Sequence, residues 1–449
     1  MSNELILNEI EKNREEHIEF LRDLIKTESY NPPGNEKNVA IKIEKYLNEN
    51  GIRCELFSFG NNRANLIAYL NNNFNGKNLI YNGHMDVVPP GNESEWKNPP
   101  LSAFIKKKKI IIGRGAADMK GGLAAMAISL KILKKLNVPL SGNLILNAVS
   151  DEETGGTYGT KWCLENKLKN INCDFIVIGE PSGLSPLPKA ILLGEKGHLQ
   201  VKIITNGISC HASTPFLGKN AIYMMSDIIQ NLDKLENIIS KVEPPFSIEE
   251  LKTFLSKVFP NREIFEKIYE EQQVLQNVIK ANTTFTKSLN TIIGGIKENV
   301  VPDKCEAVID FRLLPGQSID SVLNALKILI NDLGYEVKNE PIAKPEKVFV
   351  YLEVFHQSEP SVWKEWENSE NLKLFFSVIE NIYEKKPFYF LMPACSDAHF
   401  YRNSGFCPAT VAFGPGSAAT AHATNEFIEI DDYIKAIKTY TLFAYMLLK

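Results

Sequence analysis

Acidic and imidazole side chains recur along the chain in short stretches that follow apolar runs, and most of these stretches are rich in glycine. The stretches are 83–89, 113–122, 150–156, 179–181 and 421–426. They carry His84, Asp86, Asp118, Glu152, Glu153, Glu180 and His422. Carboxylates and imidazoles without cysteine suit Zn, Co or Mn, and two cations about 3.5–4 Å apart need a carboxylate that both share. These residue types together predict a centre of two divalent ions.

Asp118 is the natural carboxylate for two ions to share. It lies among glycines, after the apolar run 109–112 and before apolar positions at helical spacing from Leu123 to Leu133. A carboxylate at such a strand-to-helix turn is held by rigid elements at the end of a sheet, where α/β proteins place their sites. The alternatives are a phosphate-binding loop or a simple helix N-cap. Neither Walker nor GxGxxG spacing is present, which disfavours phosphate binding.

The other acids follow further predicted strands. His84 and Asp86 are two residues apart, so on an extended segment they share one face, where Asp86 can orient a metal-bound His84. The three adjacent acids 151–153 can have different roles: one carboxylate can bind metal while a neighbour acts as general base. Polar surface or core contacts are the alternative for each of them, and Glu180 could instead cap a helix before Pro181.

The elements that must position these side chains alternate between strands and helices up to residue 193. This alternation predicts an α/β fold with a mostly parallel sheet and the acids gathered at one edge. From residue 194 the order strand–helix–strand–strand–helix–strand is typical of a ferredoxin-like α+β domain. We therefore expect a first domain formed by 1–193 and 359–449, with an inserted domain at 194–358. A charged, helix-prone segment at about 241–285 is expected to be an insertion within the latter.

Composition excludes several classes of protein. The chain has 449 residues and a net charge of −4, so it carries no footprint for nucleic acid. The N-terminal apolar run is too short for a secretory signal, and no apolar run approaches membrane-spanning length. The seven cysteines are scattered without CxxC pairs, which indicates free thiols and a cytoplasmic location.

Taken together, the motifs resemble one family of metallopeptidases. GHxDVVP stands at 83–89, GRGxxDMKGG at 113–122, SDEExGG at 150–156, GEP at 179–181, HASTP at 211–215, NVVP at 299–302, DFR at 310–312 and AHxxNE at 421–426. In this order they resemble acetylornithine deacetylase, succinyl-diaminopimelate desuccinylase, aminoacylase-1 and glutamate carboxypeptidase. The resemblance implies a zinc aminopeptidase-like catalytic domain, with the inserted domain acting as lid and dimerisation domain.

The resemblance also implies roles for individual residues. One ion would bind His84, Asp118 and Glu180, and the other Asp118, Glu153 and His422. Glu152 would be the general base, Asp86 would orient His84, and the peptide after Asp118 would be cis. His211 would reach the site of a partner subunit in a homodimer and stabilise the oxyanion. The residues implied to contact substrate are Asn299, Arg312, His399 and Gly414.

Some of these roles have plain structural alternatives. His211 could be an ordinary loop histidine, and Arg312 could simply pair with Asp310 on its own strand. Desuccinylase-like members read roughly GTSDAR where this chain has 394–399, ending in His399, and a histidine cannot replace the fork of an arginine. We therefore do not expect this chain to bind a second substrate carboxylate as the desuccinylase-like members do.

The expected function is metal-dependent hydrolysis of an amide bond in an N-acyl amino acid or small peptide. Two divalent ions, Zn first and Co or Mn next, would activate a water whose proton Glu152 removes. The sequence does not separate a deacylase from a dipeptidase or a carboxypeptidase. One alternative is a catalytically inactive, metal-stabilised dimeric binding protein. Another is a two-metal phosphoesterase, which would need cationic phosphate clamps beyond Arg114 and Lys120.

Overall fold

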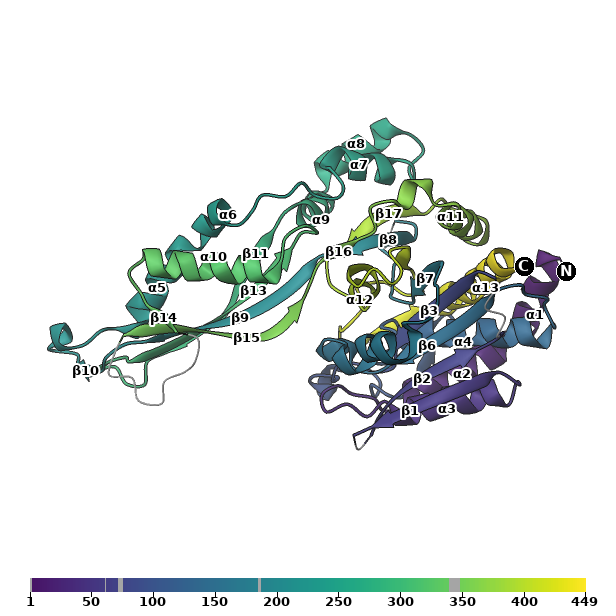
Figure 1. Ribbon diagram of the computed structural model, residues 1–449, viewed down its shortest axis with the longest axis horizontal. Helices are drawn as coiled ribbons and strands as arrows, with labels where there is room; N and C mark the ends of the chain where they lie inside the picture. The colour runs from purple at the N-terminus through teal and green to yellow at the C-terminus, as the bar shows by residue number, and fades with distance from the viewer. Residues whose placement is uncertain (1, 61, 72–75, 185–186, 339–347) are drawn as a thin grey trace.

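A computed structural model gives an elongated molecule in which an inserted domain projects from a larger first domain (Figure 1). The structure describes residues 2–60, 62–71, 76–184, 187–338 and 348–449. Two separate hydrophobic cores lie in these two parts. Both chain termini lie in the first domain.

The first domain is built on a nine-stranded mixed sheet in the order β1-β2-β6-β3-β7-β18-β8-β16, with β17 paired to β8. Its strands are β1 (Arg53–Phe59), β2 (Arg63–Tyr69), β3 (Asn78–His84), β6 (Asn143–Val149), β7 (Phe175–Ile178), β8 (Ala190–Glu195), β16 (Ser361–Val362), β17 (Phe388–Met392) and β18 (Thr410–Ala412). The α/β class predicted from the sequence is confirmed. Parallel pairing is limited to the central strands β6, β3, β7 and β18 and to the β17–β8 pair, while the remaining pairs are antiparallel.

The central strands are buried along their whole length. Every residue of β3, β6 and β7 is buried, as expected for parallel strands covered on both faces. Because these three are parallel neighbours, their carboxyl ends meet at the same edge, with His84 opposite Val149 and Asn82 opposite Ile178. The loops that follow all three strands therefore start side by side.

Helices cover the sheet, and the two longest pack directly on its centre. α4 (Lys120–Lys135) and α13 (Ile430–Leu448) contact each other and both contact β3 and β6. The other helices of this domain are α1 (Asn3–Lys12), α2 (Arg14–Lys26), α3 (Lys37–Asn48), α11 (Glu370–Tyr383) and α12 (Ala398–Asn403). Among the described residues, no helix combines the length and the hydropathy needed to cross a membrane.

The inserted domain has the predicted ferredoxin-like order. Its elements are β9 (Gly197–Asn206), α5 (Ala221–Asn231), α6 (Leu235–Ile238), β11 (Thr286–Gly294), β13 (Lys304–Leu313), α10 (Ile319–Asp332), β14 (Val337–Lys338) and β15 (Phe349–Ser358). The sheet order is β11-β13-β9-β15-β14, which leaves β11 at an edge. Buried and partly exposed residues alternate along β9 and β13, because one face packs on helices and the other does not.

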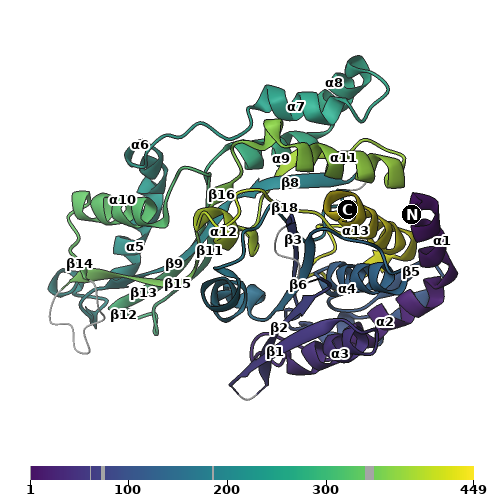
Figure 2. The same ribbon diagram turned by 45° about the vertical axis from the view of Figure 1, so that its right-hand side comes forward.

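The helix-prone insertion packs on the first domain rather than on the inserted one. It forms α7 (Ile248–Ser256), α8 (Arg262–Glu271) and α9 (Gln273–Thr283), and α7 contacts β17. The ring of Phe254 lies 6.0 Å from that of Tyr389, which in turn lies 4.7 Å from Trp366. The segment expected at 241–285 thus extends the core of the first domain, because its apolar side chains join that core. Figure 2 shows its helices on the side of the first domain where α11 lies.

The strand that leads to Asp118 differs from the sequence-based expectation. β5 (Ile110–Ile112) does not belong to the main sheet and instead forms a three-stranded sheet with β4 (Phe104–Lys106) and β19 (Phe427–Glu429). Asp118 is therefore delivered by the start of α4 and by this small sheet rather than by an end of the main sheet. Pairing between β5 and β19 brings the chain near residue 426 against the Asp118 loop.

Glu426 holds that loop. Its Oε1 accepts hydrogen bonds from the backbone N–H of Ala117 (2.8 Å) and Asp118 (3.0 Å), and its Oε2 accepts from the N–H of Gly115 (3.1 Å) and from Arg114 (2.8 Å). The carboxylate is fully buried. Charge-assisted bonds of this kind are stronger than neutral ones, so one side chain fixes the backbone on both sides of Ala116.

We expect the substitution Glu426→Ala to lower the free energy of unfolding by about 3–5 kcal/mol, because it leaves the Arg114 guanidinium buried without its partner. The amides of Gly115, Ala117 and Asp118 should also lose protection in hydrogen exchange. Glu429→Ala, at an exposed position three residues later, is the matched control and should change stability by less than about 0.5 kcal/mol. Unchanged protection in the Glu426 variant would contradict the role assigned to this carboxylate.

Candidate metal centre

Three neighbouring strand ends and two loops bring the predicted ligands together. His84 ends β3, Glu152 and Glu153 follow β6, and Glu180 follows β7. Asp118 comes from the loop before α4, and His422 from the segment between β18 and β19. The peptide between Asp118 and Met119 is cis, as the resemblance implies.

The first group of candidate ligands is buried. The Nε2 atom of His84 lies 3.1 Å from Oδ1 of Asp118 and 3.5 Å from Oε1 of Glu180. The side chain of His84 is only 1% exposed. One ligand atom from each of the three residues lies within 4.8 Å of the others, which a cation can bridge with small side-chain movements.

The second group shares Asp118 with the first. The Nε2 atom of His422 lies 3.2 Å from Oδ2 of Asp118 and 3.0 Å from Oε2 of Glu153. In contrast to His84, the His422 side chain is 52% exposed. The two carboxylate oxygens of Asp118 therefore face two different histidines, which is the arrangement that a bridging carboxylate needs.

Glu152 lies beside both groups. Its Oε2 is 3.9 Å from Nε2 of His84, and ligand atoms of His84, Glu152 and Glu153 also lie within 4.8 Å of one another. Adjacent residues in a tight turn thus send Glu153 toward His422 and Glu152 toward His84.

The carboxylate of Asp86 supports this turn as well as His84. The backbone carbonyl of Asp86 accepts a hydrogen bond from Nδ1 of His84 (2.9 Å), while the carboxylate lies 3.6 Å from that nitrogen. The same carboxylate accepts from the N–H groups of Glu152 (3.2 Å) and Glu153 (3.0 Å) and from the side chain of Asn31 (2.8 Å). Asp86 therefore links the position of His84 to that of both glutamates.

Asp151, the first of the three adjacent acids, shapes the turn instead of joining the centre. Its carboxylate accepts from Thr154 (2.6 Å) and from the N–H of Tyr158 (3.0 Å), and it pairs with Arg63 at 3.0 Å. Its φ of 74° is a left-handed conformation that aspartate tolerates better than most residues. The three acids thus have three different surroundings.

Crowding of buried carboxylates sets the electrostatics of the centre. Burial and the charge of Asp118 raise the pKa of Glu180 to about 8, and burial raises the pKa of Glu152 and of Glu153 as well. Hydrogen bonds with Asp118 and Glu153 raise the pKa of His422 to about 11. In the metal-free protein, protons on these glutamates and on His422 therefore reduce the negative charge of the centre.

The residues present fit two divalent cations. The donors are carboxylate oxygens and imidazole nitrogens with no sulfur, the set preferred by Zn, Co or Mn. Four carboxylates (Asp118, Glu152, Glu153 and Glu180) lie within or beside the two groups, and cations in place of protons would offset their charge. The open, half-exposed side at His422 leaves access for a further ligand.

His211 and Asn299 lie far from this centre. His211 ends β10 (Cys210–His211), which pairs with β12 (Val300–Val301) in a small two-stranded sheet at the end of the inserted domain that points away from the first domain (Figure 1). Asn299 lies in the turn directly before β12. The N–H of Ala212 donates to the carbonyl of Asn299 (3.0 Å), so the two loops are joined. His211 is exposed, and within the described part of the chain it lies outside both candidate ligand groups.

Arg312 and His399 lie near the junction of the domains. Arg312 pairs with Asp310 on its own strand (Nε to Oδ1, 2.8 Å) and keeps about a quarter of its side chain exposed. His399 donates from Nδ1 to the carbonyl of Ser396 (2.7 Å), and burial lowers its pKa. It also lines a cavity of about 870 Å³ that both domains border.

Gly414 has a packing role in the structure. A Cβ atom at this position would lie 2.2 Å from the carbonyl oxygen of Gly179 and 2.7 Å from that of Glu180. Its own carbonyl accepts from Nζ of Lys189 (2.9 Å) and from the hydroxyl of Ser182 (3.2 Å). The absent side chain lets this loop approach the backbone that carries Glu180.

Sequence reasoning missed several residues that support the centre. Glu426 was part of the AHxxNE stretch without a role, and Asn31 stands before two cis prolines that break the first helical region. Asp397 is fully buried, accepts from Thr160 (2.8 Å), and has a pKa raised to about 7 by burial. Their hydrogen-bond partners are far away in sequence, so no local pattern could have indicated them.

Comparison with known proteins agrees with this geometry. The family model described as peptidase family M20/M25/M40 matches residues 80–446. A probable succinyl-diaminopimelate desuccinylase of Staphylococcus aureus is 27% identical over 430 residues, covering 95% of this chain and 96% of that protein. An uncharacterized metallohydrolase of Methanocaldococcus jannaschii is 28% identical over 447 residues, covering 95% and 98%.

Solved structures share the fold over nearly the whole chain. An M20 family metallo-carboxypeptidase of Sulfolobus solfataricus superposes with a TM-score of 0.76 at 24% identity, covering 96% of this chain and 99% of that one. Human carnosine dipeptidase 1 superposes with a TM-score of 0.74 at 16% identity, covering 99% of each chain. The match across residues 80–446 shows that the chain belongs to peptidase family M20/M25/M40, a family of metal-dependent hydrolases of amide bonds.

Proposed function

We propose that this protein hydrolyses the amide bond of an N-acyl amino acid or a small peptide at a centre of two divalent ions. The observation that carries the proposal is that the two carboxylate oxygens of Asp118 face His84 and His422. The similar proteins include a probable desuccinylase, a dipeptidase and a carboxypeptidase. Hydrolysis of a panel of N-acetyl and N-succinyl amino acids and dipeptides by the metal-loaded protein tests which bond is cut.

The proposed ligands are His84, Asp118 and Glu180 for one ion, and Asp118, Glu153 and His422 for the other. Zn is the first choice, with Co or Mn as alternatives, because the donors are nitrogen and oxygen only. When bound, the ions supply Lewis acidity and lower the pKa of a coordinated water.

Glu152 is the proposed general base. Burial raises its pKa well above the usual value, and bound cations would reverse part of that rise. The carboxylate of Glu152 lies 3.9 Å from His84, and the backbone N–H of Glu152 donates to Asp86. These two contacts hold the carboxylate next to the reacting centre. It can take a proton from water at Oε2 and return it to the leaving amine.

Arg312 is the proposed contact for a substrate carboxylate. Its planar guanidinium can form two parallel hydrogen bonds with such a group, and part of it stays exposed beside Asp310. His399 stays a weaker candidate, because its ring already donates to a backbone carbonyl and is largely buried.

A homodimer through the inserted domain is supported by an exposed apolar face. Edge strand β11 and its neighbours expose large apolar side chains, and such exposed surface is typical of an interface with another chain. The most exposed are Ile296 (97%), Phe216 (96%), Leu217 (75%), Tyr223 (74%) and Ile293 (72%). His211 lies in the same part of the domain, so a partner bound there would bring His211 toward the partner's own centre, where it could stabilise an oxyanion.

The two alternative functions, a phosphoesterase and an inactive binding protein, explain fewer of the contacts around the centre. Both cations proposed as phosphate clamps are already used: Arg114 pairs with buried Glu426, and Lys120 donates to the carbonyls of Leu24 (3.0 Å) and Thr27 (2.7 Å). An inactive binding protein would not need Glu152, which lies beside the proposed ligands without being assigned to either ion. All seven cysteines are free, in agreement with the reducing cytoplasm proposed from the sequence.

The substitution Glu152→Ala should leave the metal content per chain at the wild-type value and lower kcat by roughly 10²–10⁴-fold, because it removes only the group that accepts the proton. Metal content and turnover are measured on the same sample. Glu93→Ala, which removes an exposed glutamate, should leave both unchanged. Full activity in the Glu152 variant would exclude it as the base.

The substitution His211→Ala should lower turnover by roughly 10²–10³-fold without loss of folding, since the side chain is exposed and acts on an oxyanion. Mixing this variant with Glu152→Ala under conditions that exchange subunits should restore activity to about a quarter of the wild-type value, because each mixed dimer has one complete site. A mixture no more active than its parents argues against a site shared between subunits.

Metal affinity should rise with pH between about 6 and 8. In the metal-free protein Glu180, with a pKa of about 8, and His422, with a pKa of about 11, are protonated at pH 7. Both must lose their protons to bind metal, so binding releases protons and weakens as the pH falls. Proton release in weakly buffered solution measures this, and His422→Ala should release fewer protons. A metal affinity independent of pH would contradict these ligands.

A further inference from the structure

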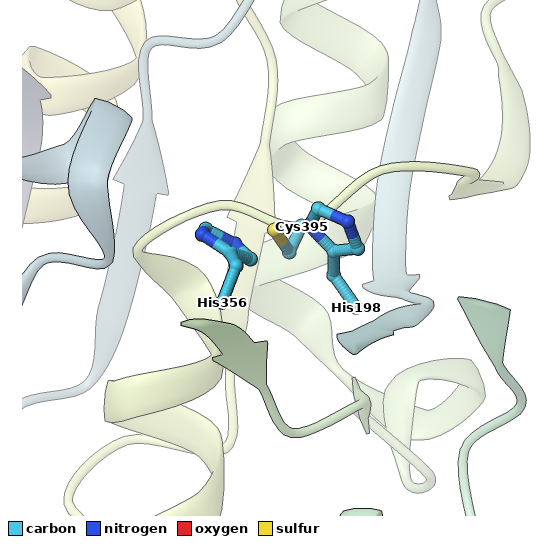
Figure 3. A group of neighbouring side chains, drawn as sticks. All are labelled: His198, His356 and Cys395. Carbon is cyan, nitrogen blue, oxygen red and sulfur yellow. The ribbon is translucent and has the colours of Figure 1, made fainter. Parts of the chain in front are cut away.

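A second cluster of metal-binding side chains lies outside the dinuclear centre. His198, His356 and Cys395 each present one ligand atom within 4.8 Å of the other two. Figure 3 shows the sulfur of Cys395 between the two imidazole rings, whose centroids are 4.3 Å apart. Three side chains of the kinds that bind zinc therefore converge from distant parts of the chain.

The cluster lies where the two domains join. His198 is the second residue of β9, and His356 lies near the end of β15, which pairs antiparallel with β9. Cys395 follows β17 in the first domain. The two histidines therefore come from the strands by which the chain enters and leaves the inserted domain, and the cysteine comes from the opposite side of that junction.

His198 is already oriented as a metal ligand would be. Its Nε2 lies 2.7 Å from Oδ2 of Asp310, and that carboxylate also pairs with Arg312. A histidine that gives one ring nitrogen to a carboxylate keeps the other for metal, and this carboxylate–histidine arrangement is the usual support of a bound cation. Nδ1 of His198 is the nitrogen left for the cluster.

The imidazole of His356 is in a state that a cation can bind directly, whereas the thiol of Cys395 must lose its proton when a cation binds. Burial, with the positive charges of His198 and Arg312, lowers the pKa of His356 to about 4, so its imidazole is neutral at pH 7. Burial, with the charges of Glu152 and Glu195, raises the pKa of the Cys395 thiol to about 12. The negative charges of the same two carboxylates favour a cation beside the sulfur. The positive charge of Arg312 opposes a cation less, since Asp310 pairs with it.

We infer that His198, His356 and Cys395 form a third cation site, separate from the dinuclear centre and selective for thiophilic ions such as Zn²⁺ or Cu⁺. Two nitrogens and one sulfur match the preferences of these ions, and three protein ligands leave a fourth position open. The dinuclear ligands include no sulfur, so the two kinds of site differ in the metals they favour. The inference does not depend on the proposed hydrolytic function.

A cation at this site would connect the two domains directly. It would join both strands of the inserted domain to the segment 393–397, which also carries buried Ser396 and Asp397. Ser396 donates to Glu195 in β8, next to the start of β9. The site would therefore link the junction to the first-domain sheet by a short chain of bonds.

Cobalt titration of the metal-free, full-length protein under anaerobic conditions tests the inference. A cobalt–thiolate bond gives a charge-transfer band in the near ultraviolet, which nitrogen and oxygen ligands do not give. We expect this band to reach the intensity of one cobalt–thiolate bond per chain, while cobalt that binds without adding to the band reports the dinuclear centre. Loss of only the cobalt that does not add to the band would count against the dinuclear centre and not against this site.

Two variants and one control make the result specific. Cys395→Ser should remove the charge-transfer band and one equivalent of cobalt, and His356→Gln should weaken cobalt binding at this site at least tenfold without unfolding the protein. Cys54→Ser, which removes a thiol on β1, should leave the band unchanged. A wild-type protein without the band, or a Cys395→Ser variant that retains it, would overturn the inference.

Discussion

One carboxylate placed between two histidines is the constraint on which the rest of this structure depends. Asp118 can face both His84 and His422 only if its loop is fixed relative to β3 on one side and to the segment before β19 on the other. Burial of Glu426 under the loop, pairing of β5 with β19 and the start of α4 all serve that end. The main sheet supplies the other candidate ligands of the centre, because the parallel strands β3, β6 and β7 end at one edge.

The same arrangement is costly without bound cations. Four carboxylates are brought together in a largely buried place, and like charges at short range raise each other's pKa values. The protein offsets part of this cost with backbone donors: the carboxylate of Asp86 accepts from the turn that carries Glu152 and Glu153. The remaining charge favours divalent cations, which explains why binding energy, protonation and catalysis are expected to be linked at this centre.

The sequence could single out the candidate ligands that the structure brings together, because most of them follow an apolar strand or lie in a glycine-rich turn whose local pattern is strong. His84, Glu153 and Glu180 could be assigned to one edge from strand order alone. It could not predict that β5 leaves the main sheet, since pairing of β5 with β19 joins segments more than 300 residues apart. Nor could it predict that α7 packs on β17, or that Gly414 is needed for close backbone contact, because both depend on tertiary neighbours. Glu426 was missed for the same reason, since its partners lie in the distant Asp118 loop.

A crystal structure of the metal-loaded protein, with anomalous scattering measured at the absorption edge of the bound metal, tests the central claim most directly. At the dinuclear centre we expect a pair of anomalous peaks about 3.5–4 Å apart, with one oxygen of Asp118 on each ion, His84 on one and His422 on the other. Fewer than two peaks at this centre, or two ions that Asp118 does not join, would contradict the account.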